Sequence, residues 1–329
     1  MKRIAVLDLG TNTFHLLISD VFTDRSTKKV FKSKIVVKLG EGGIHRNHIA
    51  EIPFKRGIVA LKHYSEIILK HKVDKVYAFA TSAIRSSVNG EEFVREVLKQ
   101  TGIKVSVISG EEEARLICLG VRECLTMGDR PVLIMDIGGG STEFIIADRS
   151  TIFARHSFNI GAARLLEMFK PSDPIKASEI KKVEAFLDQQ ILILDAAMAK
   201  FEIAQLIGSS GSFDTFAEMI GYRFQGKNVL KNVNCYSFNI TEYRKLHQIL
   251  LKSTIEERMQ MKGLIKMRVD MIVLASICTQ FILKRYDLKE MALSKYALKE
   301  GALSDVIKSM TFPKVDTGIK IASRKKVVG

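Results

Sequence analysis

Two stretches of the chain share one pattern, in which an apolar run with an acid near its end is followed by a turn of small residues and a second apolar run. The first stretch has apolar runs over 4–9 and 14–18, separated by the turn Gly10–Thr13. The pattern recurs 128 positions later, where Asp136 matches Asp8. Two apolar runs around a tight turn predict a β-hairpin. The repeat therefore predicts two related lobes, each built around one hairpin.

Strand-like and helical patterns alternate after each hairpin. Apolar residues recur at helical spacing over 54–70. Ser109 precedes Glu112 by three residues, which is a start signature for a helix running to about residue 126. The remaining pattern predicts strands over 29–39, 73–80, 103–108 and 151–158, and helices over 90–100, 177–201, 212–221, 241–257 and 267–285. Two mixed β-sheets flanked by helices follow, so the expected fold class is α/β.

The composition is that of a globular protein with two domains. The sequence has 329 residues, of which 47% are hydrophobic and 26% are charged. The formal net charge of +15 favours an anionic partner, such as a phosphate-rich substrate. Trp is absent and the basic residues are spread along the chain, so we expect no nucleic-acid partner.

No segment predicts export or membrane insertion. The start, Met-Lys-Arg before a short apolar run, is too short for a signal peptide, and no apolar run reaches about eighteen residues. Polar residues interrupt the apolar segment around 271–283, which predicts a buried helix. The four cysteines have no metal-ligand spacing and suit reduced thiols. We therefore expect a cytoplasmic protein with no membrane partner. A homodimer is compatible with the sequence, which carries no signal for the number of subunits.

The two hairpin turns have the residues of phosphate-binding loops. Glycine lets the backbone approach an anion and adopt a positive φ, while hydroxyl and amide side chains add donors. The residues expected to bind phosphate are Gly10, Thr11, Asn12 and Thr13 in the first turn and Gly138, Gly139, Gly140, Ser141 and Thr142 in the second. A glycine-rich hairpin without a ligand is the alternative interpretation.

Three further loops of small residues follow expected strands. Gly161 lies just before a helix start, which is a favourable place for an anion. Arg85 closes another loop and can grip a phosphate oxygen with its forked guanidinium. The third loop contributes Ser210, Gly211 and Ser212. Five such loops in one chain favour a substrate with several phosphates.

Acids border the hairpin turns and predict a metal site. Asp8, Asp136 and Glu143 would repel a phosphate unless they held a cation, and Mg²⁺ or another divalent cation suits carboxylate and phosphate oxygens. Hydrogen bonds to turn amides are the alternative role for these carboxylates. Hydrolysis also needs a base, and the triplet Glu111–Glu113 is the best source, although acids at a helix start also suit the helix dipole. The residues alone do not indicate which of these three glutamates is the base.

Taken together, these motifs resemble the exopolyphosphatase/guanosine pentaphosphate phosphohydrolase family, within the sugar kinase, Hsp70 and actin superfamily. The resemblance covers nearly the whole chain, in one order: Asp8–His15, Thr81–Arg85, Ile108–Leu116, Asp136–Glu143, Gly208–Ser212 and Lys299–Gly301. The strings Gly-Glu-Glu-Glu-Ala-Arg and Asp-Ile-Gly-Gly-Gly-Ser-Thr-Glu in tandem are its most specific part.

The resemblance implies a site and a domain organisation. It implies that Glu113 is the catalytic base and that Asp136 and Glu143 hold the metal. Arg85 and Ser141 match phosphate contacts. It also implies two actin-like lobes with the active site in the cleft between them. The expected lobes comprise residues 1–121 with about 300–329, and residues 122–299.

The leading hypothesis is an exopolyphosphatase that releases terminal orthophosphate from inorganic polyphosphate. Hydrolysis of guanosine pentaphosphate is the second hypothesis, because both substrates end in a phosphoanhydride. The large positive charge favours the polymer, whose phosphates can each engage a cation. A non-catalytic polyphosphate or alarmone sensor is disfavoured because Glu113, Asp136 and Glu143 are all present. An ATP-dependent kinase or actin-like ATPase is disfavoured because an acidic triplet stands in place of a kinase-type aspartate.

Overall fold

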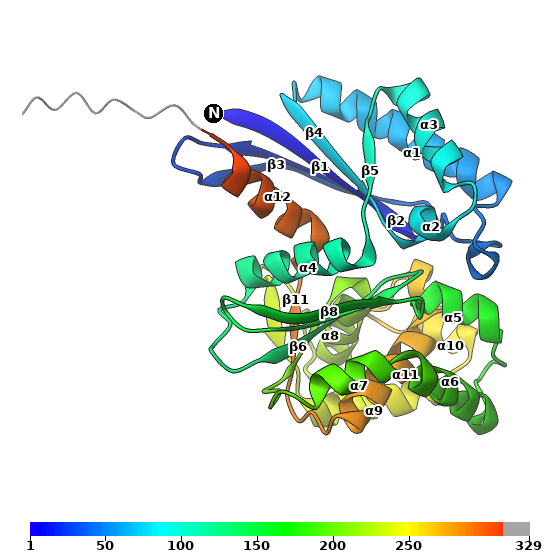
Figure 1. Ribbon diagram of the computed structural model, residues 1–329. Helices are drawn as coiled ribbons and strands as arrows, with labels where there is room; N and C mark the ends of the chain where they lie inside the picture. Colours follow the sequence, from blue (N-terminus) through cyan, green and yellow to red (C-terminus); the bar gives the residue numbers. More distant parts are fainter. Residues whose placement is uncertain (312–329) are drawn as a thin grey trace, which may run out of the picture.

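Both predicted hairpins form, and each belongs to its own β-sheet in the computed structural model, which describes residues 1–311 (Figure 1). The first sheet has the order β3-β2-β1-β4-β5, with β1 (Lys2–Leu9), β2 (Thr13–Val21), β3 (Thr27–Val36), β4 (Lys75–Ala80) and β5 (Val105–Val107). The second has the order β10-β11-β9-β6-β7-β8, with β6 (Val132–Ile137), β7 (Thr142–Ala147), β8 (Ile152–Phe158), β9 (Leu206–Ser209), β10 (Cys235–Ser237) and β11 (Met291–Ser294). In each sheet the first three strands are antiparallel, and two further strands, β4 and β5 or β9 and β11, extend the sheet in parallel. β10 adds an antiparallel edge strand to the second sheet, so the mixed sheets are confirmed.

The two hairpins are equivalent in backbone detail as well as in sequence. The amide of Gly10 donates to the carbonyl of Thr13 at 3.1 Å, and the amide of Gly138 donates to the carbonyl of Ser141 at 3.0 Å. The two hydrogen bonds are separated by the same 128 positions as the sequence repeat. The structure therefore confirms the duplication that the apolar pattern predicts.

The helices lie on both sides of the two sheets (Figure 1). The outer face of the first sheet is covered by α1 (Glu51–Lys70), α2 (Ser82–Ser86) and α3 (Gly90–Thr101). The outer face of the second sheet is covered by α5 (Ala162–Phe169), α6 (Ala177–Gln190), α7 (Leu192–Met198), α8 (Ser210–Phe224), α9 (Ile240–Lys252), α10 (Ile255–Gln260) and α11 (Ile272–Arg285). Between the two sheets lie α4 (Gly110–Cys124) and α12 (Leu298–Ser309).

The helix pair α4 and α12 joins the lobes. α4 packs against β7 and β8, α12 packs against β1 and β2, and the two helices pack against each other. The hydroxyl of Ser109 accepts a hydrogen bond from the amide of Glu112 at 3.1 Å, so the predicted helix start is confirmed. Of the C-terminal segment expected in the first lobe, residues 312–329 lie outside the described residues. The domain boundaries stay predictions.

One predicted helix is two helices in the structure. The helix expected over 177–201 is interrupted at Ile191, between α6 and α7. The buried positions keep helical spacing across the interruption: Val183, Leu187, Ile191, Leu194 and Met198. The apolar pattern therefore carries no sign of the interruption, and no Gly or Pro marks it.

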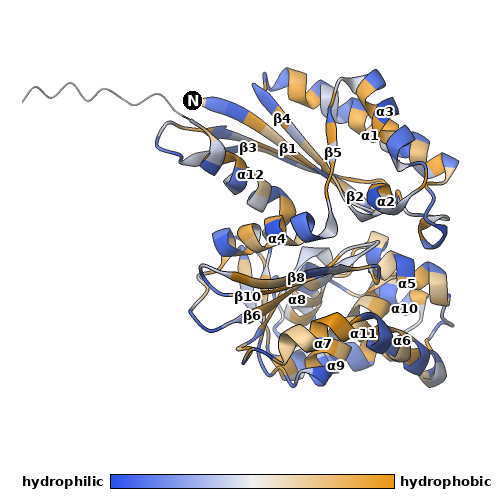
Figure 2. Cartoon of the chain, viewed as in Figure 1, coloured by the Kyte–Doolittle hydropathy of each residue, from blue (hydrophilic) through white to orange (hydrophobic). Residues whose placement is uncertain are grey.

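Two other predicted helices have different bounds. The helix expected over 241–257 is split into α9 and α10, because the hydroxyl of Thr254 accepts from the amide of Glu257 and starts a new helix. The helix expected over 267–285 begins only at Ile272, after a 3₁₀ turn at Lys266–Arg268. The rest of that helix is apolar and buried, as predicted (Figure 2). No helix within residues 1–311 combines the length and the apolar character that a membrane span requires.

Candidate active site

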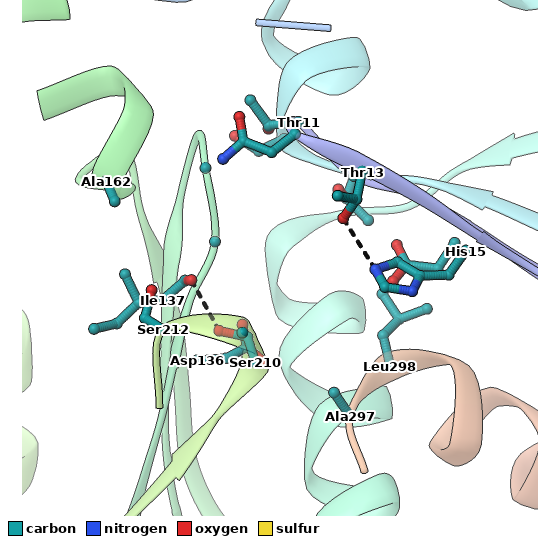
Figure 3. Close-up of a pocket in the computed structure, with 18 of the residues that line it drawn as sticks. Thr11, Thr13, His15, Asp136, Ile137, Ala162, Ser210, Ser212, Ala297 and Leu298 are labelled. Carbon is teal, nitrogen blue, oxygen red and sulfur yellow. Dashed lines mark hydrogen bonds between the residues drawn. The ribbon is translucent and has the colours of Figure 1, made fainter. Parts of the chain in front are cut away.

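A pocket of about 190 Å³ lies in the cleft between the lobes, where the turns of the two hairpins meet. Figure 3 shows Thr11 and Thr13 on one side of it and Asp136 and Ser210 on the other. Most of the predicted site residues line this pocket: Asp8, Gly10, Thr11, Asn12, Thr13, Glu113, Asp136, Gly138, Gly139, Gly140, Ser141, Ser210, Gly211 and Ser212. The fold thus brings residues that are distant in sequence to one place, as predicted for a site between the lobes.

The two hairpin turns contact each other across the pocket. A Cβ atom at Gly139 would lie 2.7 Å from Nδ2 of Asn12, and one at Gly140 would lie 2.8 Å from Oγ1 of Thr11. A side chain at either position would therefore push the lobes apart. The expected positive φ does not occur at any glycine of the two turns. That part of the prediction is wrong, and close approach of the backbones is what requires glycine here.

Four predicted site residues are not among those that line this pocket: Arg85, Thr142, Glu143 and Gly161. Thr142 is fully buried, and its hydroxyl donates to the carbonyl of Ile160 at 3.2 Å. In this structure its side chain holds the second hairpin to the next loop, in contrast to the expected contact with phosphate.

The start of α5 supports the second hairpin turn from behind. The amide of Ala162 donates to the carbonyl of Gly138 at 3.0 Å, and the amide of Ala163 donates to that of Gly139 at 2.9 Å. A Cβ atom at Gly161 would lie 2.5 Å from the carbonyl carbon of Gly139. The expectation of a free anion site at Gly161 is therefore wrong, because the helix amides are already used. Glycine is needed there so that α5 can approach the turn.

The start of α8, in contrast, presents backbone donors to the pocket. Ser210, Gly211 and Ser212 form its first turn, where amides lack partners within the helix. Ser210 has a φ of 72°, a left-handed conformation that is uncommon for serine. Its hydroxyl donates to the carbonyl of Ile137 at 2.9 Å, which ties α8 to the end of β6 (Figure 3). This helix end is a suitable anion site.

Glu113 is held by Arg85, which also contacts the second lobe. It lies on the first turn of α4, is 8% exposed, and accepts a hydrogen bond from Nη1 of Arg85 at 2.7 Å. Nη2 of Arg85 also lies 3.5 Å from the hydroxyl of Ser157, which donates to Glu143 at 2.7 Å. Arg85 thus orients Glu113. The phosphate contact expected of Arg85 stays a prediction.

Burial raises the pKa of the carboxyl groups around the pocket. It raises the pKa of Glu113, and the nearby charge of Glu143 adds to the effect while Arg85 opposes it. Burial also raises the pKa of Glu143 and Asp8 to about 7 and that of Asp136 to about 6. A carboxylate with a raised pKa is a better proton acceptor near neutral pH. The same crowding of acids favours a bound cation.

Four basic residues that the motifs did not predict as ligands also line the pocket: Lys34, Arg268, Lys295 and Lys299. Burial works to lower the pKa of Lys299, but Glu300, at 3.1 Å, and Asp8 raise it above its usual value. Lys299 therefore remains charged in the cleft. The sequence offers no signal for the other three, which are single basic residues outside the phosphate motifs.

His15 is a further pocket residue that the motifs did not select. Its Nε2 lies 3.0 Å from the hydroxyl of Thr13 (Figure 3). Burial lowers the pKa of His15 well below its usual value, and the charge of Lys299 adds to this effect. His15 is therefore neutral at neutral pH, where it can take part in hydrogen bonds without adding charge.

The donors around the pocket suit a hard cation that binds together with a phosphate. Within residues 1–311, no group of three or more His, Cys, Asp and Glu side chains is arranged to hold a metal ion. Mg²⁺, however, commonly uses only one or two carboxylates and completes its shell with water and phosphate oxygens. Asp136 and Glu143 are cross-strand partners on β6 and β7. One buried oxygen of Asp214, which also lines the pocket, has no hydrogen-bond partner among the described residues. These residues fit such an ion.

Replacing Gly211 by Ala is expected to raise the KM for a phosphate substrate by roughly 10-fold, by displacing Arg268. The new Cβ atom would lie 1.4 Å from Nη2 of Arg268, whose Nη1 donates to Thr215 at 2.7 Å. The guanidinium must then leave its place in the pocket. Steady-state kinetics of Gly211→Ala, Arg268→Ala and the double variant check this. The double variant should match Arg268→Ala alone, and additive losses would contradict the proposed route through Arg268.

Comparison with known proteins agrees with this geometry. The model of the Ppx/GppA phosphatase family matches residues 18–310. The crystal structure of an exopolyphosphatase from Cytophaga hutchinsonii is similar with a TM-score of 0.90 and 37% identity, over 94% of this chain and 99% of that chain. The likeness extends over both lobes, so the two-lobed actin-like fold expected from the sequence is confirmed.

Two relatives differ in how much of their length this chain covers. Exopolyphosphatase 1 of Mycobacterium tuberculosis is 26% identical over 285 residues, which are 84% of this chain and 80% of that protein. The bifunctional 3-dehydroquinate synthase/phosphatase of Fusobacterium nucleatum is 37% identical over 175 residues, which are 50% of this chain. The match spans 26% of that protein, or about a quarter of its length.

Proposed function

Because the chain belongs to the Ppx/GppA phosphatase family, it is a hydrolase of phosphoanhydride bonds, and we propose that it acts as an exopolyphosphatase. The reaction is release of terminal orthophosphate from inorganic polyphosphate by water. The observation that carries the proposal is the position of Glu113 in the wall of a pocket that both phosphate-binding turns also line. A terminal phosphate in this pocket meets backbone donors from both lobes and one carboxylate that can serve as a base.

In this proposal, Glu113 takes a proton from water as the water oxygen attacks the terminal phosphorus. The bridging P–O bond breaks, and the shortened polyphosphate leaves with the electron pair of that bond. Arg85 keeps the carboxylate in one orientation through the 2.7 Å hydrogen bond. Amides and hydroxyls of the two turns and of the start of α8 stabilise the charge on the phosphate oxygens. The basic residues of the pocket add to this stabilisation.

A divalent cation, most simply Mg²⁺, would be held by Asp136 and Glu143 with Asp8 nearby. When bound, the ion would neutralise charge on the phosphate oxygens. Support comes from the raised pKa of all three carboxyl groups, which burial causes. A bound cation would compensate the negative charges that burial disfavours.

The size and charge of the pocket favour a polymer that enters by its end. The volume of about 190 Å³ is below the roughly 300–1,000 Å³ of pockets that enclose a drug-sized ligand. The pocket therefore suits a terminal phosphate group better than a whole nucleotide. Guanosine pentaphosphate stays the second candidate, because its terminal phosphate could enter in the same way while the nucleoside remains outside.

The test is phosphate release in the presence of Mg²⁺, with and without EDTA, from polyphosphates of several lengths, guanosine pentaphosphate and ATP. We expect the highest kcat/KM with polyphosphate, loss of release in EDTA, and a KM for long polymers that rises steeply with salt. A higher kcat/KM for guanosine pentaphosphate would make the alarmone the substrate. Release from ATP without release from polyphosphate would overturn the proposal.

A further inference from the structure

One face of β3 carries a row of lysines that begins at the pocket. Cross-strand partners in register lie on the same face of a sheet. Three lysines of β3 pair with alternate residues of β2, which share one face of the sheet. The pairs are Lys34 with His15, Lys32 with Leu17, and Lys29 with Ser19. This is the face that packs against α12, since Leu17 belongs to the same apolar cluster as that helix. The three residues are called the lysine row below.

A β-bulge brings the third lysine into the row. In a regular strand, Lys32 and Lys34 would share one face and Lys29 would lie on the other. The register shifts between Ile18 and Ser19 of β2, so that Ser19 pairs with Lys29 and one residue of β3 is passed over. The bulge therefore moves Lys29 onto the face of Lys32 and Lys34. Its neighbour Lys28 is moved to the opposite face, where it pairs with Asp20.

The lysine row is continuous with the charges of the pocket. Lys34 lines the pocket and is itself exposed, so it lies where the pocket opens to solvent. Nζ of Lys32 lies 3.5 Å from Oε1 of Glu300, whose other oxygen is 3.1 Å from Nζ of the pocket residue Lys299. Lys29 is exposed further along the strand. Figure 1 shows β3 at the edge of the first lobe, beside α12.

Other cations lie close to the lysine row. Burial lowers the pKa of Lys32 and Lys34, and the charges of Lys299 and Arg268, respectively, add to the effect. Such repulsion among cations disfavours the unbound protein and is relieved when a polyanion lies along the row. From Lys34 to Lys29 the strand extends roughly 15 Å, at about 3.3 Å for each residue.

We propose that the lysine row is a binding track for the part of a polyphosphate chain that extends out of the pocket while the terminal phosphate is hydrolysed. The inference rests on the proposed function and adds a binding site to it. Lysines at regular intervals along a strand suit a linear anion with a repeating charge. A short substrate such as tripolyphosphate ends within the pocket and does not reach Lys29. The row therefore makes the enzyme favour long chains.

The test compares Lys29→Glu and Lys29→Glu/Lys32→Glu with the matched control Lys28→Glu, which has the same charge change as the single variant on the opposite face of β3. The KM for polyphosphate of about one hundred units should rise on the order of 5-fold for each lysine replaced, while Lys29→Glu should leave turnover of tripolyphosphate little affected. The salt dependence of polymer binding should fall by about 0.7 in log–log slope for each lysine. A polymer KM equal to that of Lys28→Glu would overturn the proposal.

Direct binding of long polyphosphate separates this inference from the proposed function. The measurement uses the full chain carrying Glu113→Gln, with and without Lys29→Glu/Lys32→Glu, so that it does not depend on turnover. If the wild-type chain releases no phosphate from polyphosphate but the lysine variant binds the polymer at least about 10-fold more weakly, the track stands and the exopolyphosphatase proposal fails. If turnover occurs and polymer binding is unchanged by the lysine variant, the exopolyphosphatase proposal stands and the track fails.

Discussion

Replacing Glu113 by Gln is expected to lower kcat for phosphate release by roughly 100-fold or more and to leave substrate binding nearly unchanged. Glutamine has the same size as glutamate and can still accept the hydrogen bond from Arg85, but its amide cannot take a proton from water. Glu113 is buried at the pocket wall, so its replacement by a neutral group of equal shape should preserve the fold. The measurement is kcat and KM with polyphosphate, together with direct binding of the polymer.

Glu111→Gln is the matched control for this prediction. Glu111 lies on the same first turn of α4, but its side chain is 71% exposed and points away from the buried pair formed by Glu113 and Arg85. We expect its kcat to stay within about twofold of wild type. If Glu113→Gln turns over at the wild-type rate, the base is assigned wrongly. If it loses binding and thermal stability as well as turnover, Glu113 has a structural role in the cleft instead.

The two glycine turns that line the pocket could be picked out because their residues are close together in sequence. A turn such as Gly10–Thr13 contains its glycine and its donors within four residues, and the acid that borders it is two positions away. The repeat at Asp136 then places the same set in the second lobe. Once two hairpins of this kind are joined in one chain, the cleft between them is the natural place for a shared ligand. The apolar pattern and this repeat predicted two related lobes with mixed sheets, whereas the actin-like arrangement around a cleft followed from the family resemblance.

The basic residues of the pocket could not be predicted because they depend on the tertiary fold. Lys34 enters from β3, Arg268 from the turn before α11, and Lys299 from the start of α12. Lys34 and Arg268 are two of 51 Lys and Arg residues in the chain, with no local pattern that separates them from the others, and Lys299 lies in a matched string that carried no assigned role. The sequence also does not show which backbone amides are already hydrogen-bonded. Gly161 precedes a helix as expected, but in the structure the amides at the start of that helix donate to carbonyls of the second hairpin turn.

Replacing Gly301 by Ala is expected to destabilise the protein by about 3 kcal/mol, because it blocks the closest contact between α4 and α12. The new Cβ atom would lie 1.8 Å from the carbonyl oxygen of Leu116 and 2.6 Å from the amide nitrogen of Gly120, and both are backbone atoms that cannot move aside alone. The higher helix propensity of alanine offsets only about 1 kcal/mol of the clash. The two helices must separate, and they carry Glu113 and Lys299, so activity should fall together with stability.

Thermal unfolding of Gly301→Ala measures this effect, with an expected fall in Tm of roughly 5–10 °C. Gly120→Ala should behave in the same way, because a Cβ atom there would lie 2.0 Å from the carbonyl oxygen of Ala297 at the start of α12.

Gly128→Ala is the control, since no atom lies within 4 Å of its Cβ position and its φ is not positive. That variant should match wild type or gain up to about 1 kcal/mol through a less flexible unfolded chain. A Gly301→Ala protein with the Tm and the kcat of wild type would mean that α4 and α12 do not pack in this register. The helix pair could not then be what fixes Glu113 and Lys299 in one pocket.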